Sequence, residues 1–270
     1  MQRRDFNSLV LSSMLIAEVL SRKALAQPSN STSTTPAATQ PGDMPLHVLA
    51  FVHNDIVMMD LIAPMTVFNL MGARIDFVAA TEAPVRTDLG MPVVPTFSIQ
   101  NAPISCDILF VPGGLKGSVE AMDHRQSLDY LAAVGAQSRY VTSVCTGSLL
   151  LGAAGLLRGF KATSHWYVRD LLGLFGAEST YSRVVMDGNR ITGGGVTAGM
   201  DFGLSVAAQL RGEQVAKTIQ LVLEYDPEPA FQAGTPETAG AELTQSVLQR
   251  RSPLIEAARE KATRIGKAWI

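Results

Sequence analysis

Cys145 is the residue in this sequence whose type and surroundings most clearly suggest chemistry. It lies where an extended run, residues 140–144, meets a run of small and apolar residues of helical type. A strand that turns tightly into a helix lifts one side chain out at the carboxyl edge of a sheet. The free N–H groups and positive dipole end of that helix face the side chain and favour the thiolate, the reactive form. The spacing predicts a nucleophile, with a buried structural cysteine as the alternative.

Two other segments are expected to reach the same sheet edge. Asp60 opens a helical stretch after the first predicted strand, and Gly113 and Gly114 follow another strand. Burial and a neighbouring thiolate raise the pKa of a carboxyl group, so a protonated Asp60 would donate a hydrogen bond or a proton. The N–H groups of Gly114 and Thr146 would hold developing negative charge.

Each of these residues also has a structural explanation. Asp60 fits the N-cap of its helix, and position alone slightly favours the cap. Gly113 and Gly114 fit a plain turn at the end of a strand equally well. His165 follows a short strand, where it would act as a base or bind substrate near Cys145, although a lone histidine is more often structural.

No metal and no cofactor are expected. His47, His53 and His124 share no ligand spacing with cysteines or carboxylates. Residues 193–199 form a glycine-rich loop, but the loop lacks the lysine of a phosphate-binding loop and the spacing of a dinucleotide fingerprint. We expect this loop to let the backbone pass close to Cys145 and Asp201 to cap the next helix.

The elements that position these residues alternate along the chain from residue 46. Strands are expected at residues 47–52, 74–80, 107–111, 140–144 and 161–164, with a hairpin over 184–192. Helices are expected at residues 60–71, 127–138, 148–157, 167–175, from 200 onward and at 213–224, and an exposed hairpin or arm at 92–99. This alternation predicts an α/β fold with a mostly parallel sheet covered on both faces. Ligands bind such sheets beyond the carboxyl ends of the strands.

Composition limits the possible partners. The 270 residues include 22 basic and 24 acidic side chains, for a formal charge of −2. This balance, without a basic stripe, argues against nucleic acid as a partner. A domain is expected over residues 45–230, followed by a helical extension, residues 231–270, that caps the domain or contacts a partner.

The first 27 residues resemble an export signal. Arg3 and Arg4 form a twin-arginine pattern, an apolar stretch follows, and Ala24 and Ala26 fit a cleavage site. The apolar stretch is too short to anchor the mature protein in a membrane. Residues 28–44 read as a disordered linker. The sequence predicts twin-arginine export and a periplasmic protein cleaved near Ala26; a retained amphipathic helix is the alternative.

The two cysteines are expected to be unlinked. Cys106 precedes the strand at 107–111, whereas Cys145 follows the strand at 140–144. In a parallel sheet these positions lie at opposite ends, roughly 15 Å apart. A disulfide requires Cα atoms within about 7 Å.

Several motifs together resemble the DJ-1/PfpI superfamily, which has a class I glutamine amidotransferase-like fold, and within it the isonitrile hydratase-like branch. The matching stretches are residues 60–68, 107–114, 143–157, 162–166, 193–202 and 223–229. The resemblance implies a flavodoxin-like three-layer sandwich, commonly a homodimer, with Cys145 on a nucleophile elbow and Asp60 supporting it. Peptidase members carry histidine directly after the nucleophile, whereas this chain has Thr146, as the isonitrile-hydrating branch does.

The resemblance implies a cofactor-free lyase that hydrates isonitriles to N-substituted formamides through a covalent adduct on Cys145. Asp60 would supply a proton, Thr146 would assist, and Gly113, Gly114 and His165 would bind substrate or developing charge. Two alternatives remain open: glyoxalase-type hydration of 2-oxoaldehydes with His165 as base, and a non-catalytic redox sensor or ligand-binding module based on oxidation of Cys145.

Overall fold

The computed structural model describes residues 45–268. The predicted export signal, residues 1–27, and the predicted linker, residues 28–44, lie outside the described residues. Within the described part of the chain, no helix is both long enough and apolar enough to cross a membrane.

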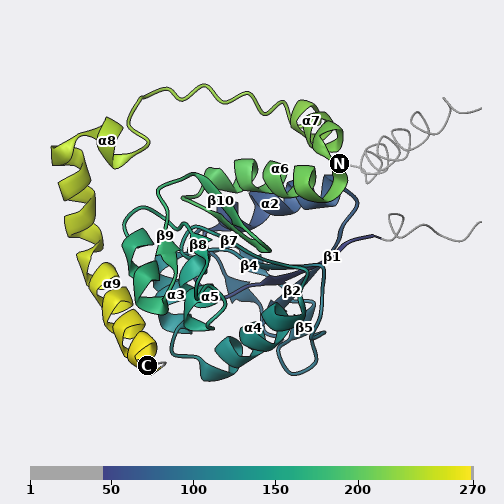
Figure 1. Ribbon diagram of the computed structural model, residues 1–270, viewed down its shortest axis with the longest axis horizontal. Coiled ribbons are helices and arrows are strands. Elements are labelled where there is room, and N and C mark those ends of the chain that lie inside the picture. The colour runs from purple at the N-terminus through teal and green to yellow at the C-terminus, as the bar shows by residue number, and fades with distance from the viewer. Residues whose placement is uncertain (1–44, 269–270) are drawn as a thin grey trace, which may run out of the picture. The chain divides into compact units, whose positions relative to one another are not determined.

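A seven-stranded sheet lies at the centre of the described chain (Figure 1). The strand order is β10-β11-β7-β6-β1-β2-β5, and all neighbours pair in parallel except β10 and β11, which form the predicted hairpin. The bounds are His47–Phe51 (β1), Arg74–Ala79 (β2), Phe97–Ser98 (β5), Ile108–Val111 (β6), Tyr140–Val144 (β7), Val184–Asp187 (β10) and Arg190–Gly193 (β11). The predicted α/β fold with a mostly parallel sheet is confirmed.

Helices cover both faces of the sheet because the central strands are apolar on both sides. In β1, Val48 and Ala50 contribute to one core and Leu49 and Phe51 to the other. The first core is covered by α2 (Met58–Leu70), α6 (Ala198–Arg211) and α7 (Glu213–Val222). The second is covered by α3 (Leu115–Ala121), α4 (Arg125–Gln137), α5 (Gly147–Ala153), the 3₁₀ helix η2 (Arg169–Phe175) and α9 (Ala241–Lys267).

Four local expectations were wrong in whole or in part. Pro92–Val93 (β4) does form a hairpin with Val85–Arg86 (β3), but β5 joins the edge of the main sheet beside β2. The helix expected at 167–175 is η2, which ends where Gly176 adopts a left-handed φ of 78°.

Asp201 does not cap α6; its carboxylate accepts hydrogen bonds from Arg183 Nε and the Tyr225 hydroxyl. Short Lys161–Ala162 (β8) pairs with Glu178–Ser179 (β9) outside the main sheet.

The C-terminal segment docks on the domain through the second half of α9. Ala258 and Ala262, one turn apart, are fully buried in the core that α9 shares with η2, α3 and α5. Lys261 Nζ donates to the Val119 carbonyl at 2.8 Å and pairs with Asp123, which Arg264 also contacts. The first half of α9 and the short α8 (Pro236–Ala239) extend beyond this anchor (Figure 1).

Candidate functional site

Cys145 lies on the predicted elbow between β7 and α5. Its backbone is left-handed, with a φ of 57°, a conformation that disfavours an L residue by about 1–2 kcal/mol. The N–H of Cys145 donates to the carbonyls of Gly193 and Gly194, and its carbonyl accepts from the hydroxyls of Ser148 and Ser164. The surrounding loops therefore hold the elbow in this strained conformation, and the glycine-rich loop does pass directly against it.

Asp60 points inward from α2 and is fully buried. It is not the N-cap: α2 begins at Met58, and the Met58 N–H instead donates to Asp88 Oδ1 at 2.8 Å. The Asp60 carboxylate accepts from the Gly113 N–H at 3.2 Å and is hydrogen-bonded to the Cys145 thiol. Its other oxygen, Oδ1, has no hydrogen-bond partner among the described residues. The structure thus pairs the carboxyl with the thiol.

The protonation of this pair differs from the expectation based on helix geometry. Burial raises the pKa of the Cys145 thiol well above its usual value, and the adjacent Asp60 raises it further. The Thr146 amide and hydroxyl lower it, but by less. Burial likewise raises the pKa of Asp60 to about 7. The expectation that Cys145 rests as a thiolate is therefore wrong, because desolvation outweighs the helix end. At neutral pH the thiol keeps its proton and donates it towards Asp60.

Gly113 and Thr146 pack next to Cys145, and Gly114 is linked to Thr146 by a hydrogen bond. The Gly114 N–H donates to Thr146 Oγ1 at 2.8 Å, and that hydroxyl also contacts Ser118 Oγ at 2.9 Å. The amides of Gly113 and Gly114 thus serve Asp60 and Thr146 and are not aimed at a substrate oxygen, contrary to the expectation for Gly114. Thr146 contacts the sulfur through both its amide and its hydroxyl.

His165 lines the same pocket as Cys145 and is stacked on Tyr167 with ring centroids 3.7 Å apart. Burial first, and then the positive charges of Arg251 and Arg169, lower its pKa to about 4. Its Nδ1 is buried without a hydrogen-bond partner among the described residues. His165 is therefore a neutral ring at physiological pH and a weak base.

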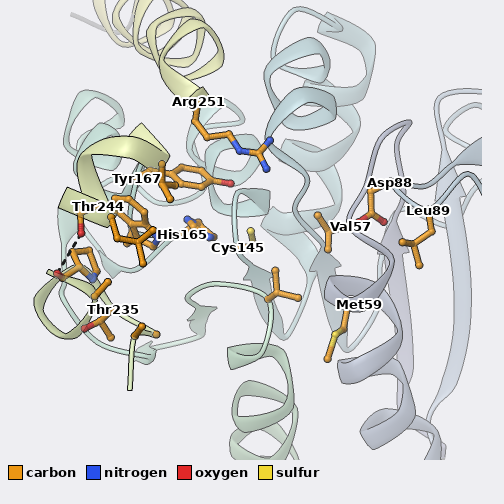
Figure 2. A pocket seen from close by; sticks show the side chains of 18 residues that line it. Val57, Met59, Asp88, Leu89, Cys145, His165, Tyr167, Thr235, Thr244 and Arg251 are labelled. Atoms are coloured by element: carbon orange, nitrogen blue, oxygen red, sulfur yellow. Dashed lines mark hydrogen bonds between the residues drawn. The ribbon is translucent and has the colours of Figure 1, made fainter. Parts of the chain in front are cut away.

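A pocket of about 650 Å³ lies over the sulfur (Figure 2). Its floor includes Cys145 and His165, and most of its remaining lining is apolar. The walls come from the start of α2, the β3–β4 turn with Asp88 and Leu89, and residues 233–251 of the C-terminal segment. The C-terminal extension therefore forms one wall of the pocket.

Sequence reasoning missed several of the residues that line this pocket. Tyr167 lies two positions after His165, so its position beside the motif was a usable signal. Asp88, Leu89 and Arg251 gave no such signal, because a turn and a charge-balanced helix look alike whether or not they reach a site.

Among residues 45–268, no group of three or more His, Cys, Asp or Glu side chains could hold a metal ion. Cys106 and Cys145 are both free, and Cys106 contacts Ser138 Oγ at 3.2 Å.

Comparisons with known proteins bear on this arrangement. The DJ-1/PfpI family model matches residues 46–209, which include every candidate site residue from Asp60 to His165. The isonitrile hydratase of Pseudomonas putida is 40% identical over 214 residues, covering 79% of this chain and 93% of that protein. A THiJ/PfpI family protein from Pseudomonas syringae, solved by crystallography, superposes with a TM-score of 0.79 at 43% identity, covering 87% of this chain and 98% of that one. Oxidised DJ-1 of Toxoplasma gondii, at 23% identity and a TM-score of 0.60, shares the fold and covers 67% of this chain and 100% of that one.

Replacing Asp60 by Asn tests the cause of the raised pKa. The folded protein holds the Asp60 proton up to about pH 7, whereas an unfolded chain releases it near 3.8. The stability of the wild type therefore falls as pH rises between these values, by on the order of 4 kcal/mol. An amide at this position does not titrate, so the stability advantage of D60N should grow from pH 5 to pH 8 in urea unfolding. A pH-independent difference would contradict the assignment, and D226N, at an exposed position, is the control.

Replacing Gly113 by Ala tests the close packing of the pair. An added Cβ would lie 2.5 Å from Thr146 N and 2.7 Å from both Asp60 Oδ2 and Cys145 Cβ. Such overpacking destabilises a core by about 1–3 kcal/mol, so G113A should lower the thermal midpoint. G173A is the matched control, because nothing lies within 4 Å of its added Cβ. Equal midpoints for the two variants would show that the site is loosely packed.

Proposed function

The chain belongs to the DJ-1/PfpI family, and we propose that within it the protein is a cofactor-free hydratase that converts isonitriles to N-substituted formamides through Cys145. The observation that carries the proposal is the buried Asp60–Cys145 pair, which retains a proton at neutral pH. The 40% identical isonitrile hydratase supports the same reaction class.

The chemistry of an isonitrile suits a pair that keeps its proton. The terminal carbon carries a lone pair and becomes strongly electrophilic only once it is protonated. A resting thiolate would supply the nucleophile without the acid, whereas a thiol hydrogen-bonded to a carboxylate supplies both. The raised pKa of the Cys145 thiol is therefore consistent with a nucleophilic role in this reaction.

In the first step, Asp60 takes the thiol proton and delivers it to the terminal carbon of the isonitrile. The sulfur forms a bond to the same carbon, which gives the thioimidate R–N=CH–S–Cys145. The proton moves over a short path because Asp60 already accepts the thiol hydrogen bond. Asp60 ends this step as a carboxylate.

In the second step, water adds to the thioimidate carbon. One water proton goes to nitrogen, and the other returns through Asp60 to sulfur as the C–S bond breaks. The products are R–NH–CHO and the original thiol, so atoms and charge balance. The amide and hydroxyl of Thr146, which contact the sulfur, stabilise the negative charge that sulfur gains as it leaves. The His165 ring lines the same space as a neutral wall.

The two alternatives receive less support from the site. Glyoxalase chemistry requires a base to move protons, and His165 has a pKa of about 4, too low for that work near neutrality. A redox sensor requires a thiolate, whereas the pKa of the Cys145 thiol is raised well above its usual value.

Turnover of a simple isonitrile tests the proposal directly. The purified protein should convert cyclohexyl isocyanide to N-cyclohexylformamide, followed by chromatography, and C145A should not. D60N should lower kcat/KM by about 10²–10⁴-fold, since it removes the group that transfers the proton. Absence of formamide, or full turnover by C145A, would overturn the assignment; lactate formed from methylglyoxal would favour the glyoxalase alternative.

The pH profile of the same reaction reports on Asp60. Below about pH 7 the carboxyl carries its own proton and cannot accept that of the thiol. The value of kcat/KM should therefore rise about tenfold per pH unit up to about pH 7 and then level off. A profile that is flat between pH 5 and pH 7 would exclude Asp60 as the proton acceptor.

We also propose that the protein is exported by the twin-arginine machinery, cleaved near Ala26, and active as a periplasmic homodimer on a small-molecule substrate. The Arg3–Arg4 pattern supports export, and the family resemblance supports the dimer. Native mass spectrometry of protein expressed in a twin-arginine-competent host should show a subunit without its first 26 residues at twice the subunit mass. An intact N-terminus in the cytoplasm would contradict export, and a monomer mass would contradict the dimer.

A further inference from the structure

Arg251 stands out in the pocket because its charge has no counterpart there. It lies on the first half of α9, and its guanidinium extends towards the space over Cys145 (Figure 2). Three other cations of α9 are engaged: Lys261 and Arg264 contact Asp123, and Arg250 Nε donates to the Ser246 carbonyl. No residue within 45–268 gives the Arg251 side chain a hydrogen bond or an ion pair.

The rest of the pocket offers little charge to balance that of Arg251. Most lining residues are apolar, contributed by α2, the β3–β4 turn and α8 with the start of α9. The one carboxylate in the lining, Asp88, lies on the opposite side and is engaged by the N–H of Met58 (Figure 2). An apolar chamber with one unpaired cation at its rim matches a ligand with an apolar body and one anionic group.

Tyr167 adds a neutral donor at the same place. Its hydroxyl points into the pocket on the side where the Arg251 guanidinium lies (Figure 2). Burial raises its pKa above the ordinary value, so the O–H stays protonated. The charge of Arg251 acts on Tyr167 and on His165, which places it within electrostatic reach of the pocket floor. A guanidinium and a phenol that line the same pocket provide hydrogen-bond donors suited to a carboxylate.

We propose that the physiological substrate is an isonitrile that carries a carboxylate, which Arg251 binds while the isonitrile carbon reaches Cys145. The inference rests on the proposed function and adds the substrate class to it. The apolar part of the substrate fills the space between the two ends, and the C-terminal extension thereby selects the substrate. A contact made away from the reacting carbon strengthens binding before and during the reaction alike, so its effect falls on KM.

A matched pair of substrates tests this at pH 8: 2-isocyano-4-methylpentanoate and its methyl ester, which differ in charge at one end. The wild type should show a kcat/KM at least about tenfold higher for the acid, through KM, as expected for a charge-assisted hydrogen bond. In Arg251→Gln the ratio should fall to near one, and Arg251→Lys should retain part of it. Arg250→Gln, one residue away and outside the pocket wall, should keep the wild-type ratio.

The outcomes separate the two proposals. Turnover of the ester as fast as the acid, or an acid preference that survives in R251Q, overturns the role of Arg251 and leaves the hydratase assignment standing. If the acid, the ester and cyclohexyl isocyanide are all left unconverted, both the hydratase assignment and the role of Arg251 are overturned. Calorimetry of N-formyl-leucine and its methyl ester with C145A and with C145A/R251Q provides a second measurement, in which tighter binding of the acid should depend on Arg251. Equal binding of acid and ester by C145A also overturns the inference.

Discussion

Removal of water from one carboxyl and one thiol is the constraint on which this site depends. Asp60 and Cys145 are buried against each other; burial raises the pKa of both groups, and Asp60 raises the pKa of the Cys145 thiol further. In water the pair would lose the Asp60 proton well below neutrality and keep the thiol proton only up to moderately alkaline pH. In the folded chain, desolvation shifts both pKa values upward, so the pair binds protons more tightly than it would in water. The elbow, the glycines and the helices around them bury both side chains.

The site maintains this environment at a cost in stability that the rest of the fold offsets. Cys145 adopts a left-handed backbone, and one oxygen of Asp60 lacks a partner among the described residues. Both features disfavour the folded state by amounts of the order of a kcal/mol or more. Two apolar cores, one on each side of the sheet, hold the elements in place. Gly113 lacks a side chain, and this lets the Asp60 carboxyl, Cys145 Cβ and the Thr146 amide lie close together.

Local patterns in the sequence were sufficient to predict the sheet, the elbow and the convergence of Asp60 with Cys145. Each of these follows from periodicity within one element and from the rule that parallel strands end at a common edge. The protonation state of the Cys145 thiol could not be predicted in this way, because its desolvation depends on how α2, β6, β7 and α5 pack around it together. Likewise, the Gly114 amide turns to Thr146 because of a side chain 32 positions later. The place of Arg251 in the pocket lining depends on how α9 docks, and the pattern of charges along α9 carries no information about that.

The pocket is built from two parts of the chain, the sheet edge and the last helix, and these parts can change separately in evolution. Asp60 and Cys145 belong to the central domain, whereas a wall of the pocket comes from residues 233–251, ahead of the point where Ala258 and Ala262 anchor the helix. Substitutions in that wall change the lining of the pocket without changing a residue of either core. One terminal segment can therefore diverge among the descendants of such a protein and reshape the pocket, while the Asp60–Cys145 pair is inherited unchanged.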